Sequence, residues 1–257
     1  MSEIKHAAEA GHWYKLDGTP YYTIIGKNGC ERTVTLADAK KLKDIVPSVT
    51  TILKECHKPG LENYKINQNI LAALTLPRIA SEKEIDWIKR VRQDAREHAK
   101  QRAESGTAIH AAIQAGFEKK PSQSYEYYLV AAKEIAKEIR DQEWICEQSF
   151  ATERYGGKVD LHNQNYLIDI KTKENGLGDV RLYDEHYMQL AGYRHGLSRH
   201  TGGINIPDCT CGILFVSEKR EAKLLLAKDE DMERGRYMFS SLLNYWYAKT
   251  GLEVSGE

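Results

Sequence analysis

Residues 155–173 read YGGKVDLHNQNYLIDIKTK, and their apolar residues are distributed as in two buried β-strands joined by a turn. Asp160, Asp169 and Lys171 nevertheless stand inside these strands. Burying an unpaired charge costs several kcal/mol, a large part of the net stability of a domain. These three ionic groups must therefore be compensated, either by a bound metal ion or by a structural ion pair.

The spacing of the three charges predicts that they meet on one face of a sheet. Asp169 and Lys171 are two residues apart, so they project from the same side of a strand. Pairing of the two strands brings Asp160 near that side, and two close carboxylates repel unless a cation lies between them. The alternative is an ion pair of Lys171 with Asp160 or Asp169 on a solvated sheet edge.

A divalent metal ion would explain all three groups. Mg²⁺ and Mn²⁺ take oxygen ligands and bind phosphates well. A lysine beside such an ion orients a phosphate oxygen or a water molecule, or acts as a base if its pKa is lowered. The set therefore favours metal-assisted hydrolysis of a phosphodiester.

Two helical segments offer further polar groups at four-residue spacing. Gly106 and His110 lie on one face of a predicted long helix, as do Gln189 and Tyr193 of a later helix. A glycine in mid-helix costs about 1 kcal/mol relative to alanine, which suggests that something passes close to the backbone there. His110 is either a nitrogen ligand or a packed histidine. Gln189 and Tyr193 either hold a phosphate or a base, or belong to an ordinary amphipathic helix.

The rest of the chain predicts a mixed α/β protein. Residues 1–80 read as an N-terminal elaboration of hairpins and helices, and residues 81–257 as a core packed with it into one globular unit. Within the core we expect a long helix over 81–117, begun by an S-x-x-E capping box at Ser81. A second helix, three strands, a helix, a pair of strands and a closing helix follow.

Composition limits the partners. The 257 residues carry 37 Lys plus Arg and 37 Asp plus Glu, so DNA binding requires local segregation of charge rather than a net positive field. No apolar run approaches the length of a membrane span, and the N-terminal stretch lacks the apolar region of a signal peptide. We therefore expect a cytoplasmic protein that does not bind membranes. Five irregularly spaced cysteines favour reduced thiols.

Four motifs in a fixed order resemble the RecB-like branch of the PD-(D/E)xK nucleases. They are G-x-x-x-H, G-x-x-D, D-x-K and Q-x-x-x-Y, at Gly106–His110, Gly157–Asp160, Asp169–Lys171 and Gln189–Tyr193. The resemblance covers about residues 81–230 and implies an αβββαβ restriction-endonuclease-like core, with a mixed central sheet flanked by helices. The proline that precedes the first aspartate in the family is Val159 here.

The same resemblance implies roles for individual residues. Lys171, Asp160 and Asp169 would be catalytic; His110, both aspartates and the backbone carbonyl of Ile170 would bind Mg²⁺ or Mn²⁺; Gln189 and Tyr193 would contact substrate; and Glu147 matches a glutamate often found on the preceding strand. Cys209 and Cys211 do not fit the cysteine pattern of relatives that carry an iron–sulfur cluster, so no such cluster is expected.

A second, shorter resemblance bears on the substrate. PSVTTILK (47–54) and KPGLENYKI (58–66) are similar to the entry segment of mitochondrial genome maintenance exonucleases and their phage and bacterial relatives. This implies an exonuclease that prefers single-stranded DNA with free ends, in DNA replication, repair or recombination, inside a bacterium or a phage-infected cell. The alternatives are a lambda-type duplex exonuclease, a structure-specific endonuclease, a catalytically silent DNA-binding module and a metal-binding scaffold for protein partners.

One face of the long helix is predicted to guide DNA. At 100° per residue, one arc of about 80° holds Lys89, Arg92, Arg96, Lys100, Thr107, His110 and Gln114, and no acidic residue from Lys89 onward shares it. We expect a cationic rail about 30 Å long that leads a DNA backbone past Gly106 and Thr107 toward the metal. The alternative is a solvated, salt-bridged helix face. Tyr125, Tyr127 and Tyr128 either stack on bases or pack in the core.

Overall fold

The structure is a computed structural model that describes residues 12–140, 143–200 and 209–254. In chain order its elements are β1 (Trp13–Lys15), β2 (Thr23–Ile25), β3 (Glu31–Thr33), α1 (Leu36–Leu42), β4 (Ile45–Pro47), α2 (Val49–Ile52), the 3₁₀ helix η1 (Leu53–Glu55), α3 (Pro59–Thr75), α4 (Glu84–Phe117), α5 (Tyr125–Glu138), β5 (Ile145–Ala151), β6 (Gly156–His162), β7 (Tyr166–Lys173), α6 (Asp184–His200), β8 (Thr210–Ser217), β9 (Ala222–Leu226) and α7 (Asp229–Thr250). From α5 onward, the order of elements is the expected one.

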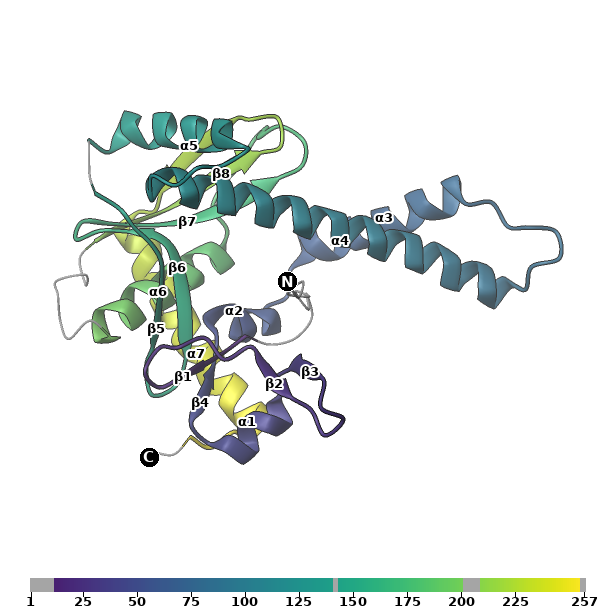
Figure 1. Cartoon of the computed structure of the whole chain (residues 1–257), viewed down its shortest axis with the longest axis horizontal. Coiled ribbons are helices and arrows are strands. Elements are labelled where there is room, and N and C mark those ends of the chain that lie inside the picture. Colours follow the sequence, from purple (N-terminus) through teal and green to yellow (C-terminus); the bar gives the residue numbers. More distant parts are fainter. Residues whose placement is uncertain (1–11, 141–142, 201–208, 255–257) are drawn as a thin grey trace. The chain divides into compact units, whose positions relative to one another are not determined.

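A five-stranded mixed sheet has the order β5-β6-β7-β8-β9. β7 and β8 run parallel, and the other neighbouring strands are antiparallel. Figure 1 shows α5 and the end of α4 over one face of this sheet, with α6 and α7 over the other. Because β7 is the middle strand and both its faces are covered, Leu167, Ile168 and Ile170 are buried. The expected mixed α/β architecture, with a central sheet flanked by helices, is confirmed.

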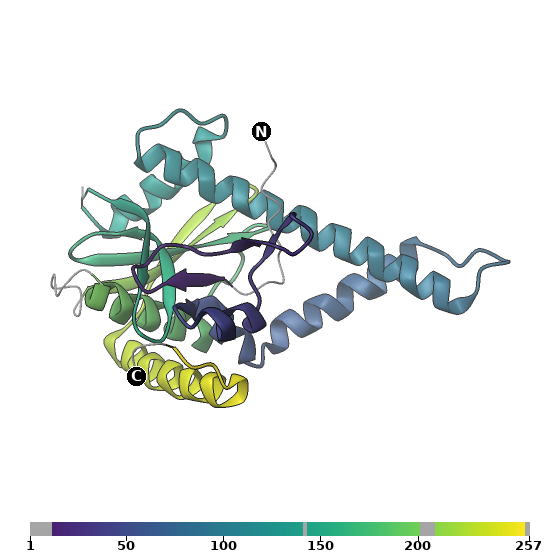
Figure 2. The same ribbon diagram turned by 60° about the horizontal axis from the view of Figure 1, so that its bottom comes forward.

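The contacts divide the chain into two units. The sheet unit joins the residues up to Cys56 with those from Ile109 onward, and the hairpin unit is His57–Ala108. The N-terminal segment belongs to the sheet unit. Ser48, directly after β4, bridges to Gly156 of β6, and β1 also contacts β6 (Figure 2). The boundary expected at residue 80 stays a prediction. Among the described residues, no helix is both long and apolar enough to cross a membrane.

The long helix is present but starts later than expected. α4 begins at Glu84 rather than at Ser81, and the expected capping box is wrong. The intervening Glu82 has other partners, since it accepts hydrogen bonds from the Ile79 N–H and the Arg90 guanidinium. These bonds fix the approach to α4 as a turn, so the first helical residue lies three positions further along the chain.

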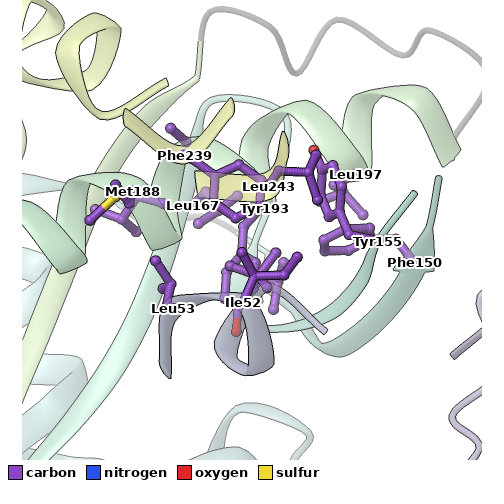
Figure 3. Close-up of a cluster of buried hydrophobic side chains, with 14 of the residues drawn as sticks. Ile52, Leu53, Phe150, Tyr155, Leu167, Met188, Tyr193, Leu197, Phe239 and Leu243 are labelled. Carbon is purple, nitrogen blue, oxygen red and sulfur yellow. The ribbon is translucent and has the colours of Figure 1, made fainter. Parts of the chain in front are cut away.

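The core between the sheet and α6 and α7 fixes the rotation of α6. Figure 3 shows side chains from α2, β5, α6 and α7 meeting there, among them Phe150 and Tyr193. Glycines let the Phe150 ring approach: a Cβ on Gly157 would lie 2.7 Å from the ring, and one on Gly196 would lie 2.1 Å from it. This packing places Tyr193 in the core and turns the same face of α6, which carries Gln189, toward β7.

Candidate active site

The two aspartates stand where the sheet opens. β6 and β7 pair only at Leu161↔Ile168 and His162↔Leu167, and the next pair in this register would be Asp160 with Asp169. The strands part at that point. The Asp160 carboxylate enters the opening instead, and its Oδ2 accepts a hydrogen bond of 2.6 Å from the Ile170 N–H. A side-chain acceptor therefore replaces the ladder hydrogen bond and keeps a carboxylate between the two strands.

A third acid aligns with them on β5. The antiparallel register of β5 and β6 places Glu147 opposite Asp160, and Lys158 forms an ion pair with Glu147. Glu147 has a φ of 54°, a left-handed conformation that residues other than glycine rarely adopt inside a strand. Glu147, Asp160 and Asp169 thus form a row of three carboxylates on three neighbouring strands, which we term the acidic row.

Lys171 is anchored at the Asp169 end of this row. Its Nζ lies 2.8 Å from Asp169 Oδ2 and donates to Gln189 Oε1 at 2.9 Å. Gln189 Nε2 in turn donates to Asp169 Oδ1 at 2.8 Å and to the Tyr193 hydroxyl at 3.0 Å. The Lys171–Asp169 pair exists, but not on a solvated edge: it lies on the middle strand, and Asp169 is 3% exposed.

The charges of the row depend on one another. Burial, followed by the neighbouring charge of Asp169, raises the pKa of Asp160 well above its ordinary value. Burial alone would lower the pKa of Lys171, but the charges of Asp169 and Asp160 outweigh it and raise that pKa. Lys171 is therefore a cation at neutral pH, and of the roles expected for it, orienting an oxygen suits this state better than acting as a base.

His110 approaches the row from α4. Its Nδ1 lies 3.8 Å from Asp160 Oδ1, and its side chain is 31% exposed. The neighbouring Ile109 and Ile113 are buried against the sheet, which fixes this face of the helix. Burial lowers the pKa of His110, so the imidazole is neutral at pH 7 and one ring nitrogen keeps a free lone pair.

The side chains gathered at the acidic row are of the kinds that bind a hard divalent cation. Carboxylates and an imidazole lie together, and Asp169 Oδ2 is buried without an aligned hydrogen-bond donor. Within the described ranges, however, no three His, Cys, Asp or Glu side chains already converge as a metal site. Each carboxylate is held by a nearer group, namely Lys158, the Ile170 N–H or Lys171. Metal binding by His110, Asp160, Asp169 and the Ile170 carbonyl stays a prediction.

The four cations of the predicted rail and Thr107 lie in the hairpin unit, whereas His110 and Gln114 lie in the sheet unit. Arg92 and Arg96 are exposed, and neither pairs with an acidic side chain of the described residues. Lys100 Nζ lies 3.6 Å from Glu104, four residues later and outside the arc, so an acid that borders the rail pairs with one of its cations. Lys89 pairs with Asp86 at 3.1 Å.

Gly106 and Thr107 are the two residues past which the rail is predicted to lead DNA. The Thr107 hydroxyl donates to the Ala103 carbonyl of its own helix, at 2.9 Å. Gly106 is half-buried on α4. The guiding of DNA by this face, and the roles of Gly106 and Thr107 in it, stay predictions.

Sequence reasoning missed Lys158. It precedes Asp160 by two residues in GGKVD, so strand alternation alone places both on one face. The structure adds that this lysine holds Glu147 as Lys171 holds Asp169. Each outer acid of the row therefore has its own ammonium, and Asp160 between them has none among the described residues.

Comparisons with known proteins add little to this geometry. No family model matches the chain. No curated protein matches it either. Among solved structures, a crystal structure from Eubacterium rectale, described as a candidate exonuclease, has a TM-score of 0.39 and 12% identity over 57% of this chain and 68% of that chain. A likeness this distant identifies neither a family nor an activity.

His186, at the start of α6, provides a test of the electrostatics near Lys171. Its Nδ1 accepts from the Tyr183 N–H at 3.0 Å, and burial, followed by the charge of Lys171, lowers its pKa from 6.5 to about 4. The unfolded chain therefore binds more protons between these pH values, so we expect stability to fall as pH drops from about 6.5 to about 4.

Replacing His186 with glutamine should flatten that fall, by about 1.4 kcal/mol for each unit of pKa difference removed. Urea unfolding at pH 7.0, 5.5 and 4.5 measures it, with the exposed His98→Gln as a control for loss of an imidazole. An unchanged pH slope in His186→Gln would contradict the assignment.

Proposed function

We propose that this chain is a Mg²⁺- or Mn²⁺-dependent deoxyribonuclease, and that it acts as an exonuclease on single-stranded DNA with free ends. The observation that supports it best is the acidic row with Lys171 fixed at one end by Asp169 and Gln189. Of the three carboxylates, only Asp160 has no ammonium among the described residues, and a bound cation would compensate its charge. An ammonium held beside them is suited to a substrate oxygen that gains charge.

Each residue of the site has a role in this proposal. His110, Asp160, Asp169 and the Ile170 carbonyl would hold the metal ion, with Glu147 at the far end of the row. Such an ion polarises a phosphoryl oxygen and lowers the pKa of a bound water. Lys171 orients a phosphate oxygen by its charge, and Gln189 holds that ammonium in place while bonded to Tyr193.

Gln189 and Tyr193 would also meet the substrate. Both are 5% exposed, so any contact they make would follow displacement of the hydrogen bonds they now form. The exposed Arg92 and Arg96, with Lys89 and Lys100, would bind the DNA backbone through its phosphates. A role in DNA replication, repair or recombination, in a bacterial or phage-infected cytoplasm, belongs to the same proposal.

The competing functions differ in what they degrade. A lambda-type enzyme requires a duplex, a structure-specific endonuclease cuts without free ends, and a silent module or a metal-binding scaffold cuts nothing. In an active enzyme the Lys171 ammonium would stabilise charge on the phosphate, whereas in a silent module it would only compensate the buried Asp169.

The decisive experiment incubates end-labelled single-stranded, duplex and closed circular DNA with the protein in Mg²⁺, Mn²⁺ or a chelator. We expect metal-dependent loss of linear single strands, little loss of duplex and none of circles. An Asp169→Asn protein, in which the amide keeps the shape of the carboxylate, serves as the inactive control. Cleavage of circles would contradict the need for free ends, and cleavage of no DNA in either metal would contradict the nuclease proposal.

A further inference from the structure

A pocket lies in the sheet unit, where the end of α4, α5 and the residues before β5 meet. Its volume is about 350 Å³, within the range of small-ligand sites. Phe117, Tyr128 and Trp144 line it, and all three are half-buried. None of them belongs to the acidic row or contacts its lysines. Three aromatic side chains facing one cavity form a surface suited to a flat ring.

The aromatic walls are held in place by packing. The Phe117 ring lies edge-on to Tyr128 at 5.0 Å and to Trp144 at 6.2 Å. A Cβ on Gly116 would lie 2.0 Å from the Tyr128 ring, so only glycine lets that ring rest against α4. The neighbouring Tyr127 has a structural use, since its hydroxyl donates to the Glu218 carbonyl. The pocket is therefore largely preformed, which reduces the ordering cost of binding.

The mouth of the pocket favours a negatively charged ligand. Lys119 and Arg140 line it together with one acid, Glu143. Within the part of the chain that the structure describes, no acidic side chain forms a salt bridge with Lys119 or Arg140. A ligand with a flat ring and an attached anionic group matches both features, and a nucleotide has this chemistry.

Three elements give the distance from the pocket to the acidic row. Phe117 follows His110 by seven residues on α4, a rise of about 10 Å. Trp144 precedes Glu147 by three residues at the start of β5, also about 10 Å. β7 gives the same distance, because Tyr166 precedes Asp169 by three residues. The Tyr166 ring lies 6.5 Å from the Trp144 ring at the pocket. At about 3.4 Å per stacked nucleotide, 10 Å corresponds to about three nucleotides.

We propose that this pocket binds one base of a single-stranded DNA whose backbone continues to the acidic row, two or three nucleotides away. The base stacks on Trp144 and Tyr128, and Lys119 and Arg140 contact the adjoining phosphates. This inference rests on the proposed nuclease function and adds a subsite that positions the strand. A base held there selects for single strands, because in a duplex the base would be paired and stacked.

The test measures binding rather than cleavage. The full chain carrying Lys171→Ala, which prevents degradation, is titrated into short labelled oligonucleotides that have one abasic position placed in turn along the strand. We expect one position at which loss of the base weakens binding roughly five- to a hundredfold. Adding Trp144→Ala should weaken binding of the intact strand by a similar factor and abolish that positional effect. Trp144→Phe, which keeps a ring, should restore most of the affinity.

Tyr245→Ala removes a 54% exposed aromatic from α7, outside the pocket, and should change nothing. Affinity within twofold after Trp144→Ala, or a positional effect that survives it, would overturn the subsite. If Trp144→Ala does not fold, Lys119→Glu with Arg140→Glu replaces it, and an unchanged salt dependence overturns the proposal.

Two further comparisons distinguish the DNA subsite from a site for free nucleotides, and its failure from failure of the nuclease proposal. Deoxythymidine monophosphate should bind too weakly to compete at micromolar concentration, and tight binding of it would assign the pocket to free nucleotides instead. Because binding is measured in a lysine variant, the result stays interpretable even if the wild-type protein cleaves no DNA. Cleavage without any base effect would overturn the subsite alone.

Discussion

Replacing Lys171 with alanine is expected to lower the rate of DNA hydrolysis by at least about a thousandfold. Removing one group that stabilises developing charge costs about 10²–10³ in other hydrolases, and this lysine also holds Asp169 and Gln189 in place. Single-turnover cleavage of an end-labelled single strand measures it. The loss should fall on kcat, with KM changed little, because the ammonium acts where charge develops.

Lys173→Ala is the matched control. Lys173 lies on the same strand and face two residues later, but it is exposed and stands over the Phe215 ring at 5.6 Å. We expect its rate to stay within about threefold of wild type. A Lys171→Ala protein as active as Lys173→Ala would exclude the catalytic assignment. Titration of Mn²⁺ into both variants by calorimetry shows whether any loss arises from the metal instead.

The placement of Asp169 and Lys171 was predictable because the side-chain period of a strand is a local property. Asp160 was harder. Its position depends on where β6 leaves β7, and the sequence indicates the turn between the strands but not the length of their ladder. Gln189 and Tyr193 could be assigned to one helix face, yet their direction depends on how Phe150 packs against α6.

Other features required the fold itself. Nothing marks Glu147 as a residue with positive φ, since Gly and Asn are the usual signals. An arc drawn on an ideal helix excluded Glu104, but a lysine side chain spans a full turn and Lys100 reaches it. β1 bridges to Pro20 after the Asp17–Gly18 turn, and it also pairs with β4, about thirty residues away in the chain. Such pairings depend on long-range burial, which no short window of sequence reports.

The largest effect on stability is expected at the contact of Phe150 with Gly196. Phe150 is fully buried, so Phe150→Ala should lower the free energy of unfolding by about 3–5 kcal/mol. Gly196→Ala should also destabilise, by about 1–3 kcal/mol, because its new methyl would lie 2.1 Å from the Phe150 ring. Helix propensity alone predicts the opposite sign for Gly196→Ala, about 1 kcal/mol of stabilisation.

The double variant separates packing from propensity. In the double variant the Phe150 ring is absent, so the methyl on residue 196 enters the vacated space. The free energy of unfolding that the double variant loses should therefore be smaller than the sum of the two single losses, by about 1 kcal/mol or more. Gly60→Ala on α3 is the control, since a Cβ there meets nothing within 4 Å. Urea unfolding of the four proteins gives the coupling. Strict additivity, or a Gly196→Ala protein as stable as Gly60→Ala, would show that the ring does not rest on the α6 backbone. Tyr193, packed 5.9 Å from the same ring, would then lack the support that fixes it beside Gln189.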